Sequence, residues 1–156
     1  MTWKKAALII LGVAALGALT YVILGLMTTD RERVTRVVRR LVSRLETRDA
    51  AGVCSLVTED YRDGQLHASR MDVRADLSRW LPLFESLSVT LDDLRVEVAG
   101  NSAKAEFLAE AAARGRGSKE VFHHKTRVRL RLQKQEGEWR VAQGEYRLPD
   151  RLRDVE

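Results

Sequence analysis

An unbroken apolar segment near the start of the chain constrains this protein more than any other feature. Residues 6–27 contain no charged side chain, and Lys4 and Lys5 precede them. A helix of that length rises ~33 Å, and the hydrocarbon core of a bilayer is ~30 Å thick. Eleven of these residues are Leu, Ile or Val, and each favours insertion by roughly 0.3–0.6 kcal/mol. The segment is therefore predicted to be a transmembrane anchor behind a short head, residues 1–5.

A cleaved secretory signal is the alternative for the same segment. The apolar regions of such signals are about 7–15 residues long and end at a small-residue cleavage site. This run is longer and closes on residues 24–27, Leu-Gly-Leu-Met. We therefore expect an uncleaved signal anchor in a single-pass membrane protein. Ala14 and Ala18 are small residues four positions apart. This pattern favours the pairing of transmembrane helices, so a homodimer is one alternative.

The orientation in the membrane is a separate question, on which the evidence divides. Arginines after the segment outnumber the two lysines before it, which by the positive-inside rule places the following domain in the cytoplasm. Those arginines are interspersed with Asp30 and Glu32, however, and long domains translocate largely regardless of charge. The short head with Lys4 and Lys5 suits an N-terminus that stays inside. We favour an extracytoplasmic domain.

Residues 28–156 have the length of one ordinary domain. The chain carries a net charge of +5, of which Lys4 and Lys5 contribute two, which leaves the domain near +3 with abundant acids. A mixed surface of this kind does not favour nucleic-acid binding. Cys54 is the only cysteine, which excludes an internal disulfide.

The first helix of this domain is defined by its apolar stripe. Behind Thr29 or Asp30 as the N-cap, six apolar residues recur at helical spacing on one face. They are Val34, Val37, Val38, Leu41, Val42 and Leu45. Arginines occupy the opposite surface, where they meet anionic headgroups or form a solvated face paired with nearby acids. They are Arg33, Arg36, Arg40, Arg44 and Arg48.

Two shorter helices are expected next. Asp49 begins one that ends near Tyr61, and another begins near Asp72. The apolar face of the latter is expected to comprise Val73, Leu77, Trp80, Phe84 and Leu87. Pro82 predicts a kink or an early stop in it, because an interior proline costs ~3 kcal/mol.

From Val89 onward the apolar period changes to two, which is typical of strands. A hairpin is expected around residues 100–102, Gly-Asn-Ser, with Asp92 and Asp93 at the start of its first strand. Turns at residues 115–117 and at Gly137 separate two further strands, the last running from Trp139 to Leu148. The long strand between these turns is expected to face inward at Phe122, His124, Thr126, Val128, Leu130 and Leu132.

This order of elements resembles the nuclear-transport-factor-2-like (NTF2-like) superfamily, which includes ketosteroid isomerase, scytalone dehydratase and the polyketide-cyclase-like proteins. The resemblance covers about residues 30–148 and rests on Leu94-x-Val96-x-Val98-x-Gly100-Asn101-Ser102-Ala103 and Gly137-x-Trp139-x-Val141. It implies an α+β fold in which a cone-shaped, curved antiparallel sheet of the cystatin-like kind packs on about three helices. The superfamily uses the enclosed pocket as an enzyme site, a ligand cup or an interaction scaffold, so the fold alone does not select a function.

A pocket in this fold would be lined mainly by aromatic residues. We expect its lining to include Tyr61, Trp80, Phe107, His124 and Trp139. His124 is the only inward titratable group on the long strand, and a lone histidine there is more simply a core or rim residue. Neighbouring His123 must point to the opposite face, which excludes a metal site shared by the two.

Enzymes of the superfamily usually hold an inward Asp or a His–Asp pair. We expect no inward aspartate on the strands, and this departure disfavours catalysis. No catalytic residue, cofactor or metal ligand is predicted.

A row of cations is expected on the outer face of the long strand. The row comprises Lys125, Arg127, Arg129 and Arg131. Alternate residues lie ~7 Å apart on one face, but the row lacks the interleaved aromatics that stack on nucleic-acid bases. The simplest interpretation is a face neutralised by cross-strand acids, namely Glu97, Glu106, Glu110, Glu136 and Glu138. The alternative is a docking face for an acidic partner.

Together these features predict a membrane-tethered binding or scaffold domain with a protein partner in a membrane complex. The alternative is a small-ligand-binding protein or an isomerase- or dehydratase-like enzyme that uses the cone pocket.

Overall fold

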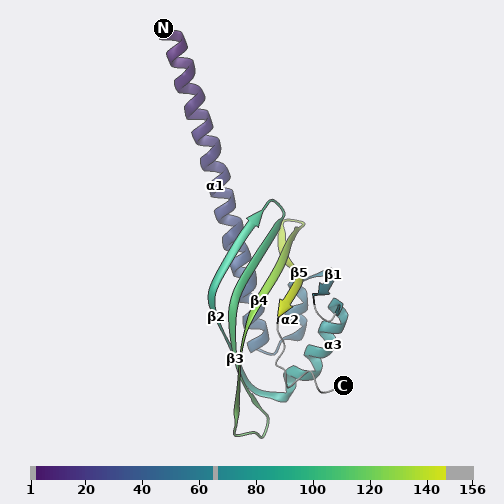
Figure 1. The fold of residues 1–156 in the computed structure, drawn as a ribbon. Coiled ribbons are helices and arrows are strands. Elements are labelled where there is room, and N and C mark those ends of the chain that lie inside the picture. Colours follow the sequence, from purple (N-terminus) through teal and green to yellow (C-terminus); the bar gives the residue numbers. More distant parts are fainter. Residues whose placement is uncertain (1–2, 65–66, 147–156) are drawn as a thin grey trace.

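The computed structural model describes residues 3–64 and 67–146, and within the first helix it describes side chains at 17–18, 20–23 and from 29 onward. The elements are α1 (Trp3–Glu46), α2 (Ala50–Ser55), β1 (Val57–Asp63), α3 (Arg70–Trp80), the 3₁₀ turn η1 (Leu81–Leu83), β2 (Phe84–Ala99), β3 (Ser102–Gly115), β4 (Val121–Gln135) and β5 (Glu138–Tyr146). Helix α1 projects beyond the domain, and a curved sheet lies along its C-terminal half (Figure 1). The predicted α+β class is confirmed.

Helix α1 carries the predicted apolar stripe. Val34, Val37, Val38 and Val42 are buried, because residues three and four apart fall on one helix face. The predicted N-cap at Thr29 or Asp30 is wrong, since α1 runs through both residues without a break. Asp30 instead accepts hydrogen bonds from distant side chains of β4 and β5.

The predicted anchor, residues 6–27, falls largely outside the part of the chain whose side chains are described. Among the residues described, no helix is long and apolar enough to cross a bilayer.

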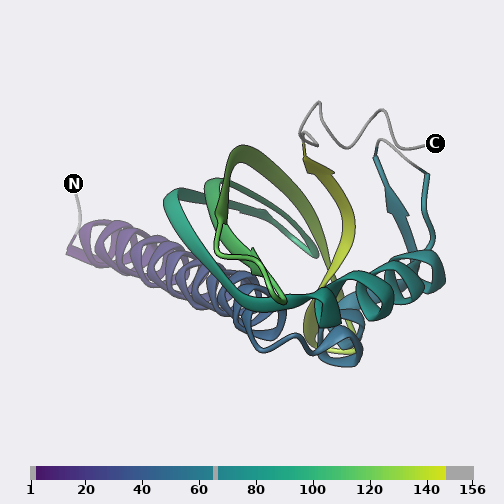
Figure 2. The same ribbon diagram turned by 90° about the horizontal axis from the view of Figure 1, so that it is seen from below.

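The five strands form one sheet in the order β1-β5-β4-β3-β2. Neighbours from β2 to β5 are antiparallel, as predicted, whereas β1 pairs in parallel with β5. The prediction of a purely antiparallel sheet is therefore wrong at this edge. Figure 2 shows the sheet bent into an arch with the helices along its open side.

The segment after α1 differs most from expectation. Asp49 begins α2 as predicted, and its side chain accepts a hydrogen bond from the Gly52 amide. However, α2 ends at Ser55, and the residues expected to extend it to Tyr61 form strand β1 instead. The edge of β5 offers this segment backbone partners over a long sequence separation, which local propensity does not register.

Helix α3 begins and ends earlier than expected. Ser69 caps it and Asp72 closes a capping box with Ser69, which is the reciprocal arrangement that satisfies two amides at a helix start. The early stop predicted from Pro82 is confirmed, because α3 ends at Trp80 and a single 3₁₀ turn follows. Phe84 and Leu87, expected on α3, lie on β2.

The hairpins form at the predicted turns. Gly100 and Gly137 both have positive φ angles, of 60° and 81°, which only glycine adopts without a steric cost. Strand β2 is longer than expected, so Asp92 and Asp93 lie within it rather than at its start. The pairing with β3 shifts between Asp92 and Arg95, and Asp93 absorbs this bulge with a φ of 52°.

The hydrophobic core lies between α1 and the inner face of the sheet. Leu130 and Leu132 of β4 are buried as predicted, opposite the small side chains of Ala105 and Ala103 on β3. These alanines leave room for α1 to pack close to the sheet, which it contacts through β2, β3 and β5.

Candidate functional site

Three of the residues predicted to line a pocket lie together in the hydrophobic core. Tyr61 of β1, Phe107 of β3 and Trp139 of β5 are all buried and pack among the core valines and leucines. Protein interiors are packed as densely as organic crystals. The chain's own aromatic rings therefore occupy the interior at these three positions.

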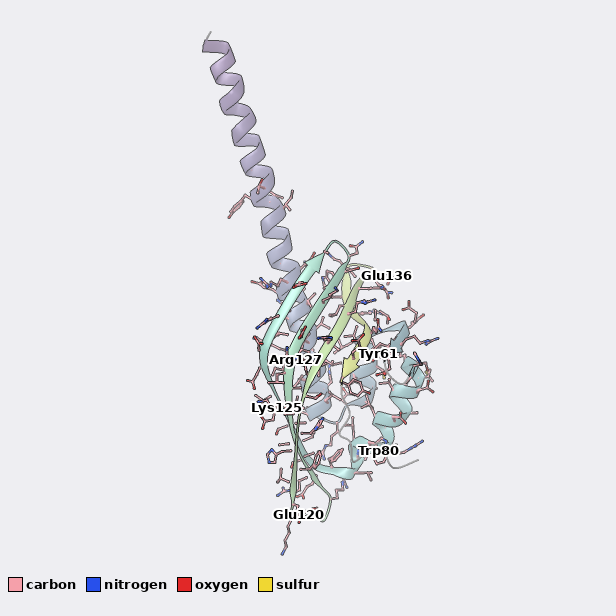
Figure 3. All side chains as sticks on the ribbon, in the orientation of Figure 1. Tyr61, Trp80, Glu120, Lys125, Arg127 and Glu136 are labelled. Carbon is pink, nitrogen blue, oxygen red and sulfur yellow. The ribbon has the colours of Figure 1, made fainter. Side chains whose placement is uncertain are left out.

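The other two predicted residues lie elsewhere. Trp80 ends α3 with 52% of its surface exposed, and Figure 3 shows it well away from Tyr61. His124 is half-buried on β4, and its ring stacks on exposed Phe122 with centroids 6.4 Å apart. His124 is not among the core residues that include Tyr61, Phe107 and Trp139.

A buried aspartate on β1 contradicts the expectation that the strands carry no inward aspartate. Asp63 is 2% exposed and pairs with Gly144 of β5. The hydroxyl of Tyr146 donates a hydrogen bond to it. The sequence signal was its position two residues after Tyr61, since alternate residues of a strand share a face. The sequence analysis predicts a helix up to Tyr61, and in a helix residues 61 and 63 do not share a face.

The charge of Asp63 acts on both neighbouring phenols. Burial, followed by the negative charge of Asp63, raises the pKa of Tyr146 to about 12 and that of Tyr61 to about 12. Both phenols therefore stay protonated at neutral pH, and Tyr146 serves as a hydrogen-bond donor. A buried carboxylate with a phenol donor is an arrangement that can exchange protons with a ligand.

Gly144 makes room for this cluster. A Cβ atom at this position would lie 2.9 Å from the Tyr61 hydroxyl and 3.5 Å from Leu130 Cδ2. The Gly144 amide also donates a hydrogen bond to Tyr61, which lowers the pKa of the phenol against the larger effect of burial. A side chain at position 144 would displace the Tyr61 ring.

The predicted cation row lies exposed on the outer face of the sheet, where Figure 3 shows Lys125 and Arg127. Arg127 bonds Glu106 at 2.8 Å, Arg129 lies 3.5 Å from the same carboxylate, and Lys125 lies 3.7 Å from Glu110. The hydrogen bond from Arg127 lowers the pKa of Glu106. Arg131 has no carboxylate within 4 Å among the described residues. The row is therefore partly neutralised by acids of β3.

Comparison with known proteins assigns most of the chain to one family. A family model, the SnoaL-like domain, matches residues 27–144. The chain belongs to the SnoaL-like family. A search of curated proteins finds none that matches the chain.

Solved structures similar to this SnoaL-like domain share its fold. A candidate scytalone dehydratase from Novosphingobium aromaticivorans superposes with a TM-score of 0.71 at 15% identity, over 77% of this chain and 84% of that one. An NTF2-like superfamily protein from Salmonella enterica gives 0.70 at 19%, over 78% and 92%. An NTF2-like protein with a cystatin-like fold from N. aromaticivorans gives 0.64 at 20%, over 86% and 88%. The predicted NTF2-like fold is confirmed.

The described part of the SnoaL-like domain contains no group of three His, Cys, Asp or Glu side chains close enough to hold a metal ion. The candidate site for acid–base chemistry is the cluster of Asp63, Tyr61 and Tyr146. Because Asp63 is almost fully buried, a ligand would have to displace neighbouring side chains to reach it.

Proposed function

We propose that this protein is a membrane-tethered SnoaL-like domain that binds or scaffolds a partner protein in a membrane complex. The observation that carries the proposal is the buried packing of Tyr61, Phe107 and Trp139. Small-molecule sites need an open, largely preformed pocket. An interior filled by the chain's own rings favours a structural scaffold over a catalytic cup.

The tether follows from the apolar segment and from the helix that contains it. Helix α1 extends from Trp3 to Glu46 without interruption, so residues 6–27 and the stripe at Val34 and Val38 belong to one rod. In this proposal the domain is held next to the bilayer with no flexible linker between them. We place the domain on the extracytoplasmic side, with Lys4 and Lys5 inside.

The tether and its orientation can be tested on the full chain in membranes. Full-length protein should resist carbonate extraction, and external protease should digest the domain in intact spheroplasts. Recovery in the soluble fraction at full mass would exclude the anchor, whereas a mature N-terminus near Thr28 would indicate a cleaved signal. Protection of the domain from external protease would reverse the orientation.

The outer cation row is the proposed docking face. Among the described residues, Lys125, Arg127 and Arg129 form ion pairs with two acids of β3, Glu110 and Glu106, and Arg131 extends the row. An acidic partner would complete the neutralisation, and electrostatic complementarity of this kind mainly sets specificity and association rate.

The docking face can be tested by charge reversal. Arg127→Glu with Arg129→Glu should weaken crosslinking to the membrane-complex partner, and added salt should weaken it in the wild type. Arg74→Glu with Arg79→Glu, on exposed positions of α3, is the matched control. Crosslinking that responds equally to both pairs would remove this face from the proposal.

A small-ligand or dehydratase-like activity is the second candidate, favoured specifically by Asp63 and the two phenols. In this candidate function the ligand displaces the hydrogen bond between Tyr146 and Asp63. Asp63 then accepts a proton from the ligand, and the freed Tyr146 hydroxyl donates a hydrogen bond to a ligand oxygen. Similarity to a candidate scytalone dehydratase supports the same class. Asp63→Asn should then abolish turnover of hydroxylated aromatic compounds, and His124→Gln, outside the cluster, should not. A ligand that binds the folded state raises the thermal midpoint of unfolding. Failure of every such compound to raise the midpoint of the wild type would exclude this second candidate function.

A further inference from the structure

A groove lined by arginines lies between α1, the end of α2 and the start of β5. Arg33, Arg36 and Arg40 of α1 and Arg140 of β5 surround it, and Val37 and Trp139 contribute apolar lining. Positions 33, 36 and 40 are spaced three and four apart, so they align along one face of the helix. Four cations thus gather around a partly apolar groove.

The acids within reach do not neutralise this groove. Glu138 is bound to Arg140 at 3.3 Å. Asp30 lies 3.8 Å from Arg33 but already accepts closer hydrogen bonds from Lys134 and Trp139. Arg33 keeps 51% of its side chain exposed. In the described part of the chain, no carboxylate lies within 4 Å of Arg36 or Arg40, so the groove retains an excess of positive charge.

The groove lies at the end of the domain from which α1 emerges. Asp30 holds the β4–β5 hairpin against α1 through Lys134 and Trp139. Figure 3 shows Glu136, in the turn of this hairpin, at that end, and Glu120 at the opposite end. If residues 6–27 span the bilayer, this end of the domain meets the headgroup layer.

The arginines of α1 lie at increasing distances from the predicted membrane segment, so they differ in how closely they can approach the headgroups. Arg33 lies about 9 Å beyond Met27, Arg36 about 14 Å and Arg40 about 20 Å, at 1.5 Å per residue. Helical side chains tilt toward the N-terminus, here toward the bilayer, whose polar layer is about 5–7 Å thick on each side. Arg33 can therefore reach the headgroups, and Arg36 lies within a screening length of about 8 Å of them.

We propose that the membrane-proximal end of this arginine groove, at Arg33 and Arg36, binds the phosphate groups of anionic phospholipids. The inference rests on the proposed membrane anchor. Guanidinium groups are well suited to phosphate, because their planar N–H fork bonds two oxygens at once. Binding there fixes the direction in which α1 tilts and so orients the domain on the membrane.

Reconstitution of the full chain into lipid nanodiscs tests the proposal. Discs of phosphatidylcholine alone are compared with discs that contain about one third phosphatidylglycerol, and thermal unfolding of the domain is followed. A ligand that binds only the folded state raises the unfolding midpoint. We expect a midpoint a few degrees higher in the anionic discs, and loss of this difference at high salt.

Paired variants assign the effect to the groove. Arg33→Gln with Arg36→Gln should remove most of the difference between the two discs and leave the midpoint in phosphatidylcholine discs unchanged. Arg40→Gln alone should remove less, because it lies farther from the bilayer. Arg74→Gln with Arg79→Gln, the same charge change on α3, should keep the full difference.

Three results would overturn the proposal. Equal wild-type midpoints in the two discs would exclude anionic lipid binding, and an equal loss in the α3 control would exclude the groove as its site. An equal rise with inorganic phosphate in phosphatidylcholine discs would make the groove a site for free anions. Failure of the chain to enter either disc is distinguishable, because it removes the anchor and the lipid proposal with it.

Discussion

The indole nitrogen of Trp139 donates a hydrogen bond to Asp30 Oδ1 at 3.2 Å and so joins α1 to β5 across 109 positions of sequence. Lys134 Nζ lies 3.1 Å from the same oxygen and 5.8 Å from the centre of the Trp139 ring. These three side chains fix the sheet at the point where α1 enters the domain.

A double-mutant cycle measures the bond itself. Trp139→Phe and Asp30→Ala should each lower the free energy of unfolding by about 1–3 kcal/mol, because each removes a partner of a charged hydrogen bond. Since the two side chains are in contact, their effects should couple by about 0.5–3 kcal/mol in chemical denaturation. Asp93→Asn, at an exposed position, is the control and should change little. Additive effects of the first two changes would show that the bond contributes nothing.

The pH dependence of stability follows from the same contact. The hydrogen bond from Trp139, ahead of the contributions of Lys134, lowers the pKa of Asp30 below its ordinary value of 3.8. A carboxyl whose pKa is lower in the folded state than in the unfolded state stabilises the fold fully above its unfolded pKa. This stabilisation is lost as the pH falls through the folded pKa. Wild type should therefore lose stability below about pH 4 more steeply than Asp30→Asn. The free energy of unfolding of both proteins is measured in urea as the pH is lowered. The same loss of stability in both proteins at acid pH would contradict this prediction.

Alkaline titration reports on the Asp63 cluster. Tyr61 and Tyr146 have pKa values raised to about 12 from an ordinary value of 10. As the pH rises, tyrosines ionise in the unfolded state before they ionise in the folded state. The contribution of both phenols to the free energy of unfolding should therefore be fully present below pH 10 and be lost as the pH rises toward 12. Asp63→Asn removes a negative charge and should lower both pKa values, as followed by phenolate absorbance. Unchanged phenol pKa values in the variant would show that the charge of Asp63 does not act on Tyr61 and Tyr146.

A glycine substitution tests the close approach at β5. Gly144→Ala should destabilise the domain by about 1–3 kcal/mol, because the added methyl forces the Tyr61 ring to move. Gly115→Ala is the matched control, since its Cβ would meet nothing closer than 3.9 Å. Equal thermal midpoints for the two variants would contradict the packing described here.

The inward phase of β4 can be tested with acid substitutions on its two faces. Leu130→Asp buries a charge without a partner and should unfold or aggregate the domain. Arg131→Asp, the next residue on the exposed face, should be tolerated within about 0.5 kcal/mol. Similar unfolding midpoints for the two variants would contradict the inward phase of Leu130.

Local patterns in the sequence determined much of this fold. The stripe from Val34 to Val42, the alternation through Leu130 and Leu132, and the turns at Gly100 and Gly137 all depend on neighbours within a few residues. Side-chain period and glycine's access to positive φ act at that range, so these features could be predicted.

The tertiary structure decided what depends on distant partners. Residues 57–63 became a strand because β5 offers a free edge, and that pairing buried Asp63 beside Tyr146. Asp30 could not act as a helix cap once Trp139 and Lys134 held it in the middle of α1. Local propensities amount to less than about 1 kcal/mol per residue. Contacts between residues far apart in sequence therefore override them, and only the folded chain reveals which contacts form.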